Sequence, residues 1–344
     1  MASPEVRAGL SGCYGPQELD GLQPELDVRG HLGQRSSMQS RRDFLTRAAV
    51  GSIGFAGFSA FGIDPFERAG KPRLRLSIAA YSFREFFKDS TTKRAKAAPA
   101  DKQIDLFQFI DYAADHGCAG VELTSYYFPL DCTPEFVAKV RRHAFVRGLS
   151  VSGTAIGNTF TNPAGPERDK NVAMLKQWVD YAAILGAPHI RVFAGEAPKG
   201  VSYDDARKNC LSTLEECCDY SGKHGIMLGI ENHGGIVAKP EQLLSIVRDV
   251  KSPWLGINLD TANFHTEDPY ADFTRCAPYA VNVQVKDEIR RAGQKAGEPA
   301  DIRRYFQILR DANYQGWVAL EYESATDPFE AIPPLLKQMK ELID

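Results

Sequence analysis

From residue 74 onward, short apolar segments alternate with segments that have the spacing of amphipathic helices. The short segments are candidate strands: LRLSIAAY (74–81), GVEL (120–123), SVSGTAI (150–156), HIRVFAG (189–195), IMLGIE (226–231), LGINLD (255–260), AVNVQVKD (280–287) and WVALEYE (317–323). They lack strict alternation of apolar and polar residues, which indicates burial on both faces, as parallel sheets require. We therefore expect a parallel sheet whose strands are connected by helices.

Segments with helical spacing lie between these strands, and several end at a glycine that can serve as a C-cap. They include residues 105–117, 133–148, 172–186, 206–225, 241–250 and 302–316. Eight strand–helix repeats fit an α/β fold of the (β/α)8 TIM-barrel type better than an open, doubly wound sheet. A doubly wound sheet would more often carry a glycine-rich phosphate turn after its first strand, and no G-x-G-x-x-G follows residues 74–81.

The N-terminal segment differs in character from the repeats. Residues 38–62 read MQSRRDFLTRAAVGSIGFAGFSAFG, in which Arg41-Arg42 precede Phe44-Leu45 and a weakly hydrophobic run rich in glycine and alanine. This pattern resembles a twin-arginine export signal. A helix of the folded domain would carry several interior glycines, each costing about 1 kcal/mol, and the apolar run is shorter than the roughly 20 residues of a membrane span.

We therefore expect three parts in the chain. Residues 1–37 are a non-native or disordered extension, because Met38 stands directly before the paired arginines as an alternative start. Residues 38–72 are the twin-arginine signal and a linker, and residues 73–344 are the TIM-barrel catalytic domain. The signal predicts export by the twin-arginine machinery, with the protein either periplasmic or membrane-anchored on the periplasmic side.

The composition is that of a globular protein, with 43% hydrophobic residues and a formal net charge of −3. This net charge gives no indication of a nucleic-acid-binding surface. The cysteines that follow the signal show no metal-binding or redox spacing. We expect inert buried thiols, with disulfides as the alternative in an oxidising compartment.

Side chains that can bind a metal ion end four of the predicted strands: Glu231, Asp260, Gln284 and Glu321. Because the C-terminal ends of barrel strands converge on one face, we expect these groups in one mouth. Carboxylates packed together without a countercharge would repel and raise one another's pKa, which a divalent cation relieves. Oxygen-rich ligation suits one Mn²⁺ or Mg²⁺ ion, with Co²⁺, Fe²⁺ or Zn²⁺ as alternatives. Each carboxylate taken alone could instead be a helix cap or a solvated loop residue.

Five short motifs resemble those of the xylose isomerase-like (β/α)8 barrels: GVEL (120–123), IENH (230–233), LDTANF (259–264), VQVKD (283–287) and GWVALEYE (316–323). This family comprises sugar isomerases, ketose 3-epimerases, inosose dehydratases and endonuclease-type barrels. In it, the metal is typically held by Glu, Asp, His and Glu from strands five to eight, and Glu231, Asp260 and Glu321 match the three carboxylates. The chain departs at Gln284, where the family pattern is of the His-x-Lys-Asp type.

The resemblance implies a reaction in which Glu231 and Glu321 are the catalytic acid–base pair. The metal would coordinate adjacent hydroxyl and carbonyl oxygens of an open-chain sugar and make the C–H between them more acidic. The two glutamates would then move the proton through a cis-enediolate.

Six further residues are predicted to bind substrate: Glu122, Arg191, His233, Asn263, His265 and Lys286. Asn263 and His265 follow strand six, where the resemblance implies a substrate-contacting or supporting group. His233 could orient Glu231 or bind a hydroxyl, and Lys286 could support a carboxylate or an enediolate. Each has a structural alternative; for Glu122 and Arg191 it is a buried salt-bridge network that lines the barrel.

We expect a metal-dependent sugar isomerase or epimerase that acts on a free sugar or keto-sugar, because sugar phosphates are largely retained in the cytoplasm. One alternative is a lyase or dehydratase that eliminates a group beside the carbonyl of a 3-keto-glycoside. Another is a non-catalytic sugar-binding protein on a degenerate barrel. An abasic-site endonuclease is disfavoured because few histidines are suitably placed for a zinc cluster. Homo-oligomer formation is open, since the sequence indicates no interface.

Overall fold

The computed structural model describes residues 64–91 and 98–344. The predicted N-terminal extension and the twin-arginine motif lie outside the described residues, which include only the end of the linker. There, Phe66 and Arg68 bond to backbone carbonyls at and beside the start of the seventh barrel strand. Within the described ranges, no helix combines the length and apolar character needed to cross a membrane.

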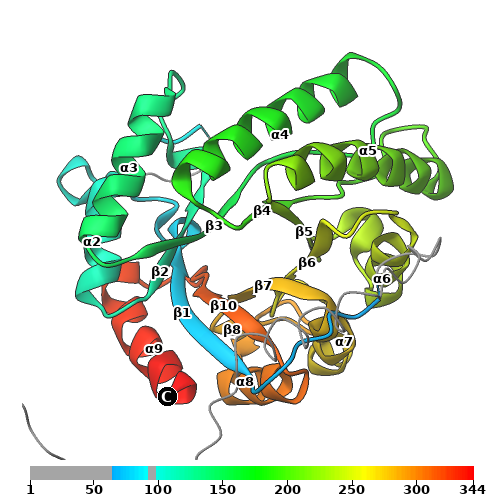
Figure 1. Cartoon of the computed structure of the whole chain (residues 1–344). Helices are drawn as coiled ribbons and strands as arrows, with labels where there is room; N and C mark the ends of the chain where they lie inside the picture. The colour runs from blue at the N-terminus through cyan, green and yellow to red at the C-terminus, as the bar shows by residue number, and fades with distance from the viewer. Residues whose placement is uncertain (1–63, 92–97) are drawn as a thin grey trace, which may run out of the picture. The chain divides into compact units, whose positions relative to one another are not determined.

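Within the described residues, eight parallel strands close into a barrel in the order β1, β10, β7, β6, β5, β4, β3, β2 (Figure 1). The strands are β1 (Arg73–Ala79), β2 (Gly120–Thr124), β3 (Ser150–Ala155), β4 (His189–Val192), β5 (Met227–Glu231), β6 (Leu255–Asp260), β7 (Ala280–Val285) and β10 (Gln315–Leu320). The barrel closes where β1 pairs with β10, with Leu76 opposite Val318. The predicted (β/α)8 barrel is confirmed.

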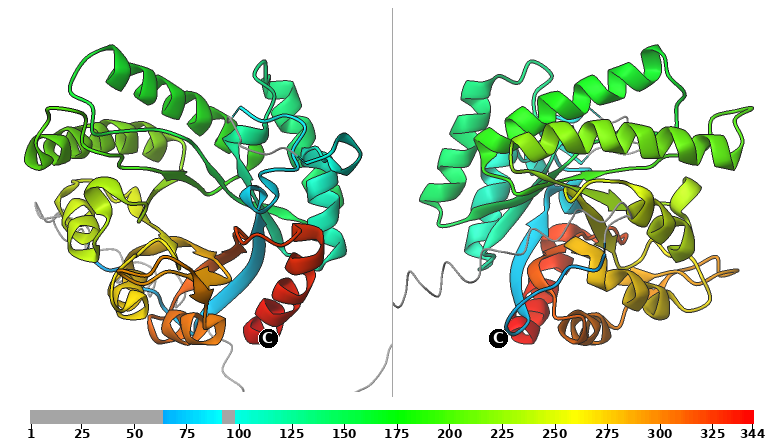
Figure 2. Two further views of the ribbon diagram at one scale, coloured as in Figure 1. Left: turned by 180° about the vertical axis from the view of Figure 1, so that it is seen from behind. Right: turned by 45° about the vertical axis from the view of Figure 1, so that its right-hand side comes forward.

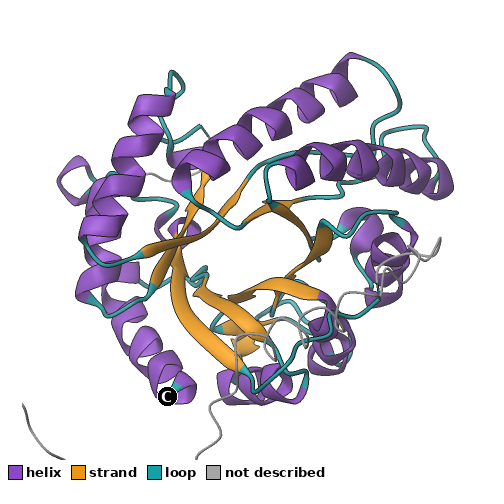
Figure 3. Cartoon of the chain, viewed as in Figure 1, coloured by secondary structure: helices purple, strands orange, loops and turns teal. Residues whose placement is uncertain are grey.

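Helices surround the strands on the outside (Figure 3). They are α2 (Leu106–Asp115), α3 (Pro134–Val146), α4 (Pro166–Leu185), α5 (Tyr203–Lys223), α6 (Pro240–Asp249), α7 (Pro269–Cys276), α8 (Ile302–Asp311) and α9 (Pro328–Ile343). Helix α9, red in Figure 2, lies beside β1 in blue, so the last helix covers the first strand.

The strands are apolar without alternation because both of their faces are covered. Every residue of β2, β4 and β6 is buried. One face packs against the helices and the other fills the barrel, as the parallel arrangement demands.

Most helices begin at a side chain that accepts a bond from a free backbone N–H of the first turn, which fixes where each begins. The capping residues are Asp105, Thr133, Ser202, Asp268, Asp301 and Asp327. Helix α4 instead begins after Gly165 and ends at Gly186, which adopts a left-handed conformation. It therefore starts six residues before the predicted segment 172–186.

A polar layer fills the barrel directly beneath the C-terminal mouth. Side chains that point inward recur at every second strand position, so Asn258 lies one layer below Asp260 and Asn282 one layer below Gln284. Asn282 donates hydrogen bonds to Glu122 at 2.7 Å and to Asn258 at 2.8 Å. These residues are buried, and the network supports the mouth from within.

Candidate active site

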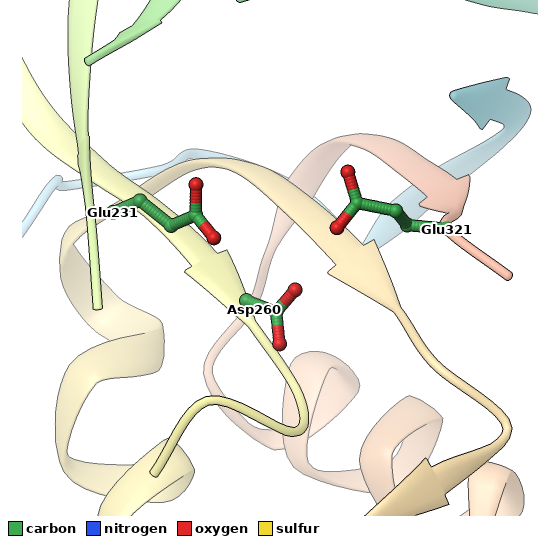
Figure 4. A group of neighbouring side chains, drawn as sticks. All are labelled: Glu231, Asp260 and Glu321. Carbon is green, nitrogen blue, oxygen red and sulfur yellow. The ribbon is translucent and has the colours of Figure 1, made fainter. Parts of the chain in front are cut away.

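Three carboxylates meet at the mouth of the barrel (Figure 4). Glu231 ends β5, Asp260 ends β6 and Glu321 directly follows β10. One oxygen of each lies within 4.8 Å of the others, and all three side chains are buried. The chain thus brings together three of the four predicted metal ligands.

Glu231 is held by two neighbours. Its Oε2 lies 3.0 Å from Nε of Arg191, which is itself buried, and its Oε1 accepts a hydrogen bond from Asn263 at 2.7 Å. Arg191 also donates to the carbonyl of Ile156 and lies over the ring of Phe193. Because Arg191 is fixed in this way and Asn263 bonds to the other oxygen, the fold sets the direction of the Glu231 carboxylate.

Asp260 is fixed through its own backbone by a side chain from the end of the neighbouring strand. The side chain of Asn232, which follows β5, accepts from the N–H of Asp260 at 2.8 Å and donates to its carbonyl at 2.9 Å. Oδ1 of Asp260 accepts from the N–H of Ala262 at 2.7 Å. Oδ2 has no hydrogen-bond partner within the described residues and instead faces the ammonium of Lys286 at 3.1 Å.

Lys286, just after β7, is the cation at the centre of this group. Its Nζ lies 2.7 Å from Glu323, 3.1 Å from Asp260 and 3.6 Å from Glu321. Burial acts to lower the pKa of Lys286, but these carboxylates raise it well above its ordinary value. Lys286 is therefore a fixed positive charge beside the triad.

Gln284 does not present its oxygen to the carboxylates. Its Oε1 accepts a hydrogen bond from Asn258 at 2.5 Å, and its Nε2 donates to Glu122 at 2.7 Å and to Glu321 at 2.8 Å. If the amide were flipped, its oxygen would face the carboxylates of Glu122 and Glu321. An amide oxygen cannot donate a hydrogen bond, so a bond would form only to a protonated carboxyl group. This arrangement does not support the predicted metal ligation by Gln284; the residue positions Glu321.

The site carries more negative than positive charge. Five carboxylates, those of Glu122, Glu231, Asp260, Glu321 and Glu323, face the three cations of Arg84, Arg191 and Lys286. Burial raises the pKa of Glu231, and it raises the pKa of Glu321 strongly, against the opposing effects of Arg191 and Lys286 respectively.

With all five carboxyl groups ionised, the group would carry two more negative than positive charges, and this excess adds to burial in raising the pKa of Glu231 and Glu321. Oxygen ligands from three carboxylates suit a hard divalent ion, and a charge of +2 would balance the excess. The residues that surround the triad therefore fit one divalent metal ion held by Glu231, Asp260 and Glu321.

A cavity of about 850 Å³ opens above the triad. Glu231 and Glu321 lie on its wall, together with Arg191, Asn263 and Lys286. His233 also lines it, with its ring 4.5 Å from that of Phe193. Arg191, His233, Asn263 and Lys286 are therefore placed where a substrate would bind.

The other two predicted substrate residues lie elsewhere. Glu122 is fully buried in the polar layer, where Asn282 and Gln284 bond to its oxygens, and it does not line the cavity. His265 is exposed and bonds to Arg290, also away from the cavity. These positions do not support the predicted substrate contacts of Glu122 and His265, because a side chain at a strand end can point down into the barrel or out along a loop.

Several residues that line the cavity were not predicted from the sequence. Tyr126 lies two residues after the end of β2, and its place after a predicted strand was a usable signal. Gln177 and Trp178 belong to a helix that was predicted, but no periodicity tells which helix face overlooks the mouth. Glu323, two residues after Glu321, was not among the predicted site residues, and it pairs with Lys286.

Residues 110–343 match the family described as "Xylose isomerase-like TIM barrel", which is more than half of the chain. The chain belongs to the xylose isomerase-like TIM barrel family, as the strand-end motifs indicated. It is 26% identical over 239 residues to a hydroxypyruvate isomerase of Escherichia coli K12, a match that covers 65% of this chain and 90% of that protein.

Solved structures share the fold. A D-allulose 3-epimerase from Methylomonas sp. superimposes with a TM-score of 0.61 at 18% identity, covering 80% of this chain and 100% of the other. A 3-keto-D-glucoside 4-epimerase from E. coli gives a TM-score of 0.58 at 15% identity, with coverages of 78% and 100%. At these identities the likeness concerns the barrel alone.

Proposed function

We propose that this protein is a metal-dependent isomerase or epimerase that acts on a free sugar or keto-sugar by proton transfer through a cis-enediolate. The observation that carries the proposal is the placement of two buried glutamates, Glu231 and Glu321, around one point at the floor of an open cavity. A proton removed on one side of a carbon atom can then be returned by a second carboxyl group.

The surroundings suggest different roles for the two glutamates. Arg191 and Asn263 both stabilise the charged form of Glu231, which suits a base. The pKa of Glu321 is raised strongly by burial, so its protonated form is available as an acid. In the reverse reaction, Glu321 would act as the base and Glu231 as the acid.

Lys286 and Asn263 would hold the oxygens of the substrate. Lys286 brings a buried positive charge to the point where the carbonyl oxygen of the substrate gains negative charge, which lowers the energy of the enediolate. Asn263 bonds to both Glu231 and Lys286, so it holds the base and the cation at a fixed position relative to each other.

A divalent ion, Mn²⁺ or Mg²⁺ in preference to Co²⁺, Fe²⁺ or Zn²⁺, would be held by Glu231, Asp260 and Glu321. When bound, it would supply further positive charge to polarise the carbonyl group. The oxygen-only ligand set supports the preference for a hard ion, since no imidazole reaches the triad among the described residues.

The test is incubation of the Mn²⁺-loaded protein with a panel of ketoses and keto-sugars in deuterated buffer, followed by NMR. Deuterium at the carbon beside the carbonyl, together with an isomeric product, is the expected result. Loss of water or of an aglycone would instead identify the lyase alternative. Absence of both from a protein that binds the sugars would favour the non-catalytic alternative.

The proposal includes export. The paired arginines Arg41-Arg42 and the weakly hydrophobic run that follows them support transport of the folded protein by the twin-arginine machinery. Its substrate would then be an unphosphorylated sugar on the periplasmic side of the membrane.

A further inference from the structure

The cavity above the triad has two chemically different ends. Its ionisable floor comes from residues at or after the ends of β1, β4, β5, β7 and β10: Arg84, Glu85, Arg191, Glu231, Lys286, Glu321 and Glu323. Another part of its lining, here called the α4 wall, consists of Phe128, Pro129, Leu130, Cys132, Met174, Gln177, Trp178 and Tyr181. The lining residues of the α4 wall carry no charged side chain.

One face of helix α4 builds half of this wall. Met174, Gln177, Trp178 and Tyr181 have the i, i+3, i+4, i+7 spacing of a single helix face. The ring of Trp178 meets those of Phe128 and Tyr181 edge to face, at centroid distances of 5.1 and 5.5 Å. The aromatic surface is thus held rigid by its own packing.

One hydrogen-bonded chain joins polar groups of the α4 wall to each other. Gln177 donates to the hydroxyl of Tyr181 at 3.4 Å, and that hydroxyl donates to the carbonyl of Cys132 at 2.8 Å. The hydroxyl of Tyr181 thus already donates its proton within the wall, and an apolar ligand group would leave this chain intact.

Leu130 adds an independent observation. It is 92% exposed, the highest fraction among the exposed large apolar side chains of the described residues, and it lies at the edge of the cavity. Covering Leu130 with an apolar ligand group would remove apolar surface from water, which favours binding.

We propose that the α4 wall binds an apolar aglycone, so that the substrate is a keto-sugar joined by a glycosidic bond to an aromatic or alkyl group. The sugar would lie over the charged floor and the aglycone against Leu130, Met174 and Trp178. This inference rests on the proposed function for the sugar end only. A second sugar ring is disfavoured because most side chains of the wall are apolar and offer few partners to its hydroxyl groups, and a phosphate because the wall offers no cation.

The test uses matched pairs of methyl and phenyl glycosides of glucose, galactose, mannose and xylose, in both anomeric forms. Binding to the full-length, Mn²⁺-loaded protein is measured by calorimetry. We expect at least one phenyl glycoside to bind roughly tenfold or more tightly than its methyl partner, since burial of a ring is worth more than 1.4 kcal/mol. The proposal is overturned if no phenyl glycoside exceeds its methyl partner, or if disaccharides of the same sugar bind equally well.

Two variants locate the effect. Leu130→Asp and Gln177→Glu each put a charge on the α4 wall at an exposed position, so folding is preserved. Both should remove the phenyl preference while leaving methyl glycoside binding unchanged. Phe145→Asp is the matched control, because Phe145 is 80% exposed on α3 and lies outside the cavity. A phenyl preference that survives both wall variants refutes the assignment.

The outcome is separable from that of the proposed function. Deuterium exchange into a small keto-sugar requires only the floor, whereas the phenyl preference requires only the wall. If deuterium exchange is absent, the phenyl preference can still be measured, and the reverse also holds.

Discussion

The ammonium of Lys286 lies 3.1 Å from Oδ2 of Asp260, the one oxygen of that carboxylate without a hydrogen-bond partner among the described residues. The lysine therefore supplies a countercharge at the point where a metal ion would bind. Two cations with overlapping positions compete for the same carboxylates.

This competition predicts the behaviour of Lys286→Met. Without metal, the free energy of unfolding of the variant should be roughly 3–5 kcal/mol lower than that of the unaltered protein, because the buried carboxylates lose their cation. Addition of Mn²⁺ should then raise its melting temperature more than that of the unaltered protein. Differential scanning calorimetry with and without Mn²⁺ checks both statements. An Mn²⁺ shift equal to or smaller than that of the unaltered protein would contradict them.

Gln284→Glu tests the role assigned to the amide. The substitution keeps the size of the side chain but places an oxygen where Nε2 now donates to Glu122 and Glu321. The metal-free variant should lose several kcal/mol of stability through repulsion and an unpaired buried charge. Mn²⁺ should restore part of it. Unchanged stability in urea unfolding without metal would mean that the amide does not hold these carboxylates apart.

The acid–base assignment predicts that Glu231→Gln and Glu321→Gln each lower kcat by roughly 10²–10⁴-fold, the usual contribution of general acid–base catalysis. Glu323→Gln is the control, because Glu323 contacts Lys286 at the edge of the site and its loss should cost less. Metal content is measured for every variant, since Glu231 and Glu321 are also proposed ligands. Similar losses of kcat in all three variants would argue against a special role for the pair.

The sequence predicted those features that depend on local pattern and on the geometry of a barrel. Continuous apolar runs placed the eight strands within a few residues, and convergence of strand ends brought Glu231, Asp260 and Glu321 together. Helices α7 and α9 were not among the segments named from the sequence; α7 is short, and Pro333 and Pro334 interrupt the helical pattern of α9. The two-residue strands β8 (Glu288–Ile289) and β9 (Glu298–Pro299) are too short to leave a signal.

The direction of a side chain was harder to predict than its place on a strand. The departure at Gln284 was visible in the sequence, but the way its amide points is set by Asn258 and Glu122, which come from other strands. Likewise, Lys286 reaches the triad only because β6, β7 and β10 are neighbours. Such contacts join residues distant in the chain, and no periodicity encodes them.

Export by the twin-arginine machinery remains a prediction about residues outside the described structure. Residues 38–72 fused to a reporter that is active only in the periplasm should direct its export. Arg41→Lys combined with Arg42→Lys should abolish the signal, whereas Arg47→Lys in the same segment should not. Export of the doubly substituted fusion at the original level would refute the assignment.

His189 gives a prediction on pH that is independent of the metal. It is buried on β4, and its ring occupies the space that a side chain at Gly153 would need. Burial lowers the pKa of His189 to about 4, against an ordinary value of about 6.5.

Because the folded state binds the proton less readily than the unfolded state, the contribution of His189 to stability is complete above about pH 6.5 and is lost as the pH falls toward 4. The loss amounts to about 3 kcal/mol. His189→Asn has no proton to take up, so the stability of the unaltered protein relative to this variant should fall by that amount between about pH 7 and pH 4. Urea unfolding of both proteins over this range checks it, and a constant difference would show that the folded barrel accepts a charged imidazole.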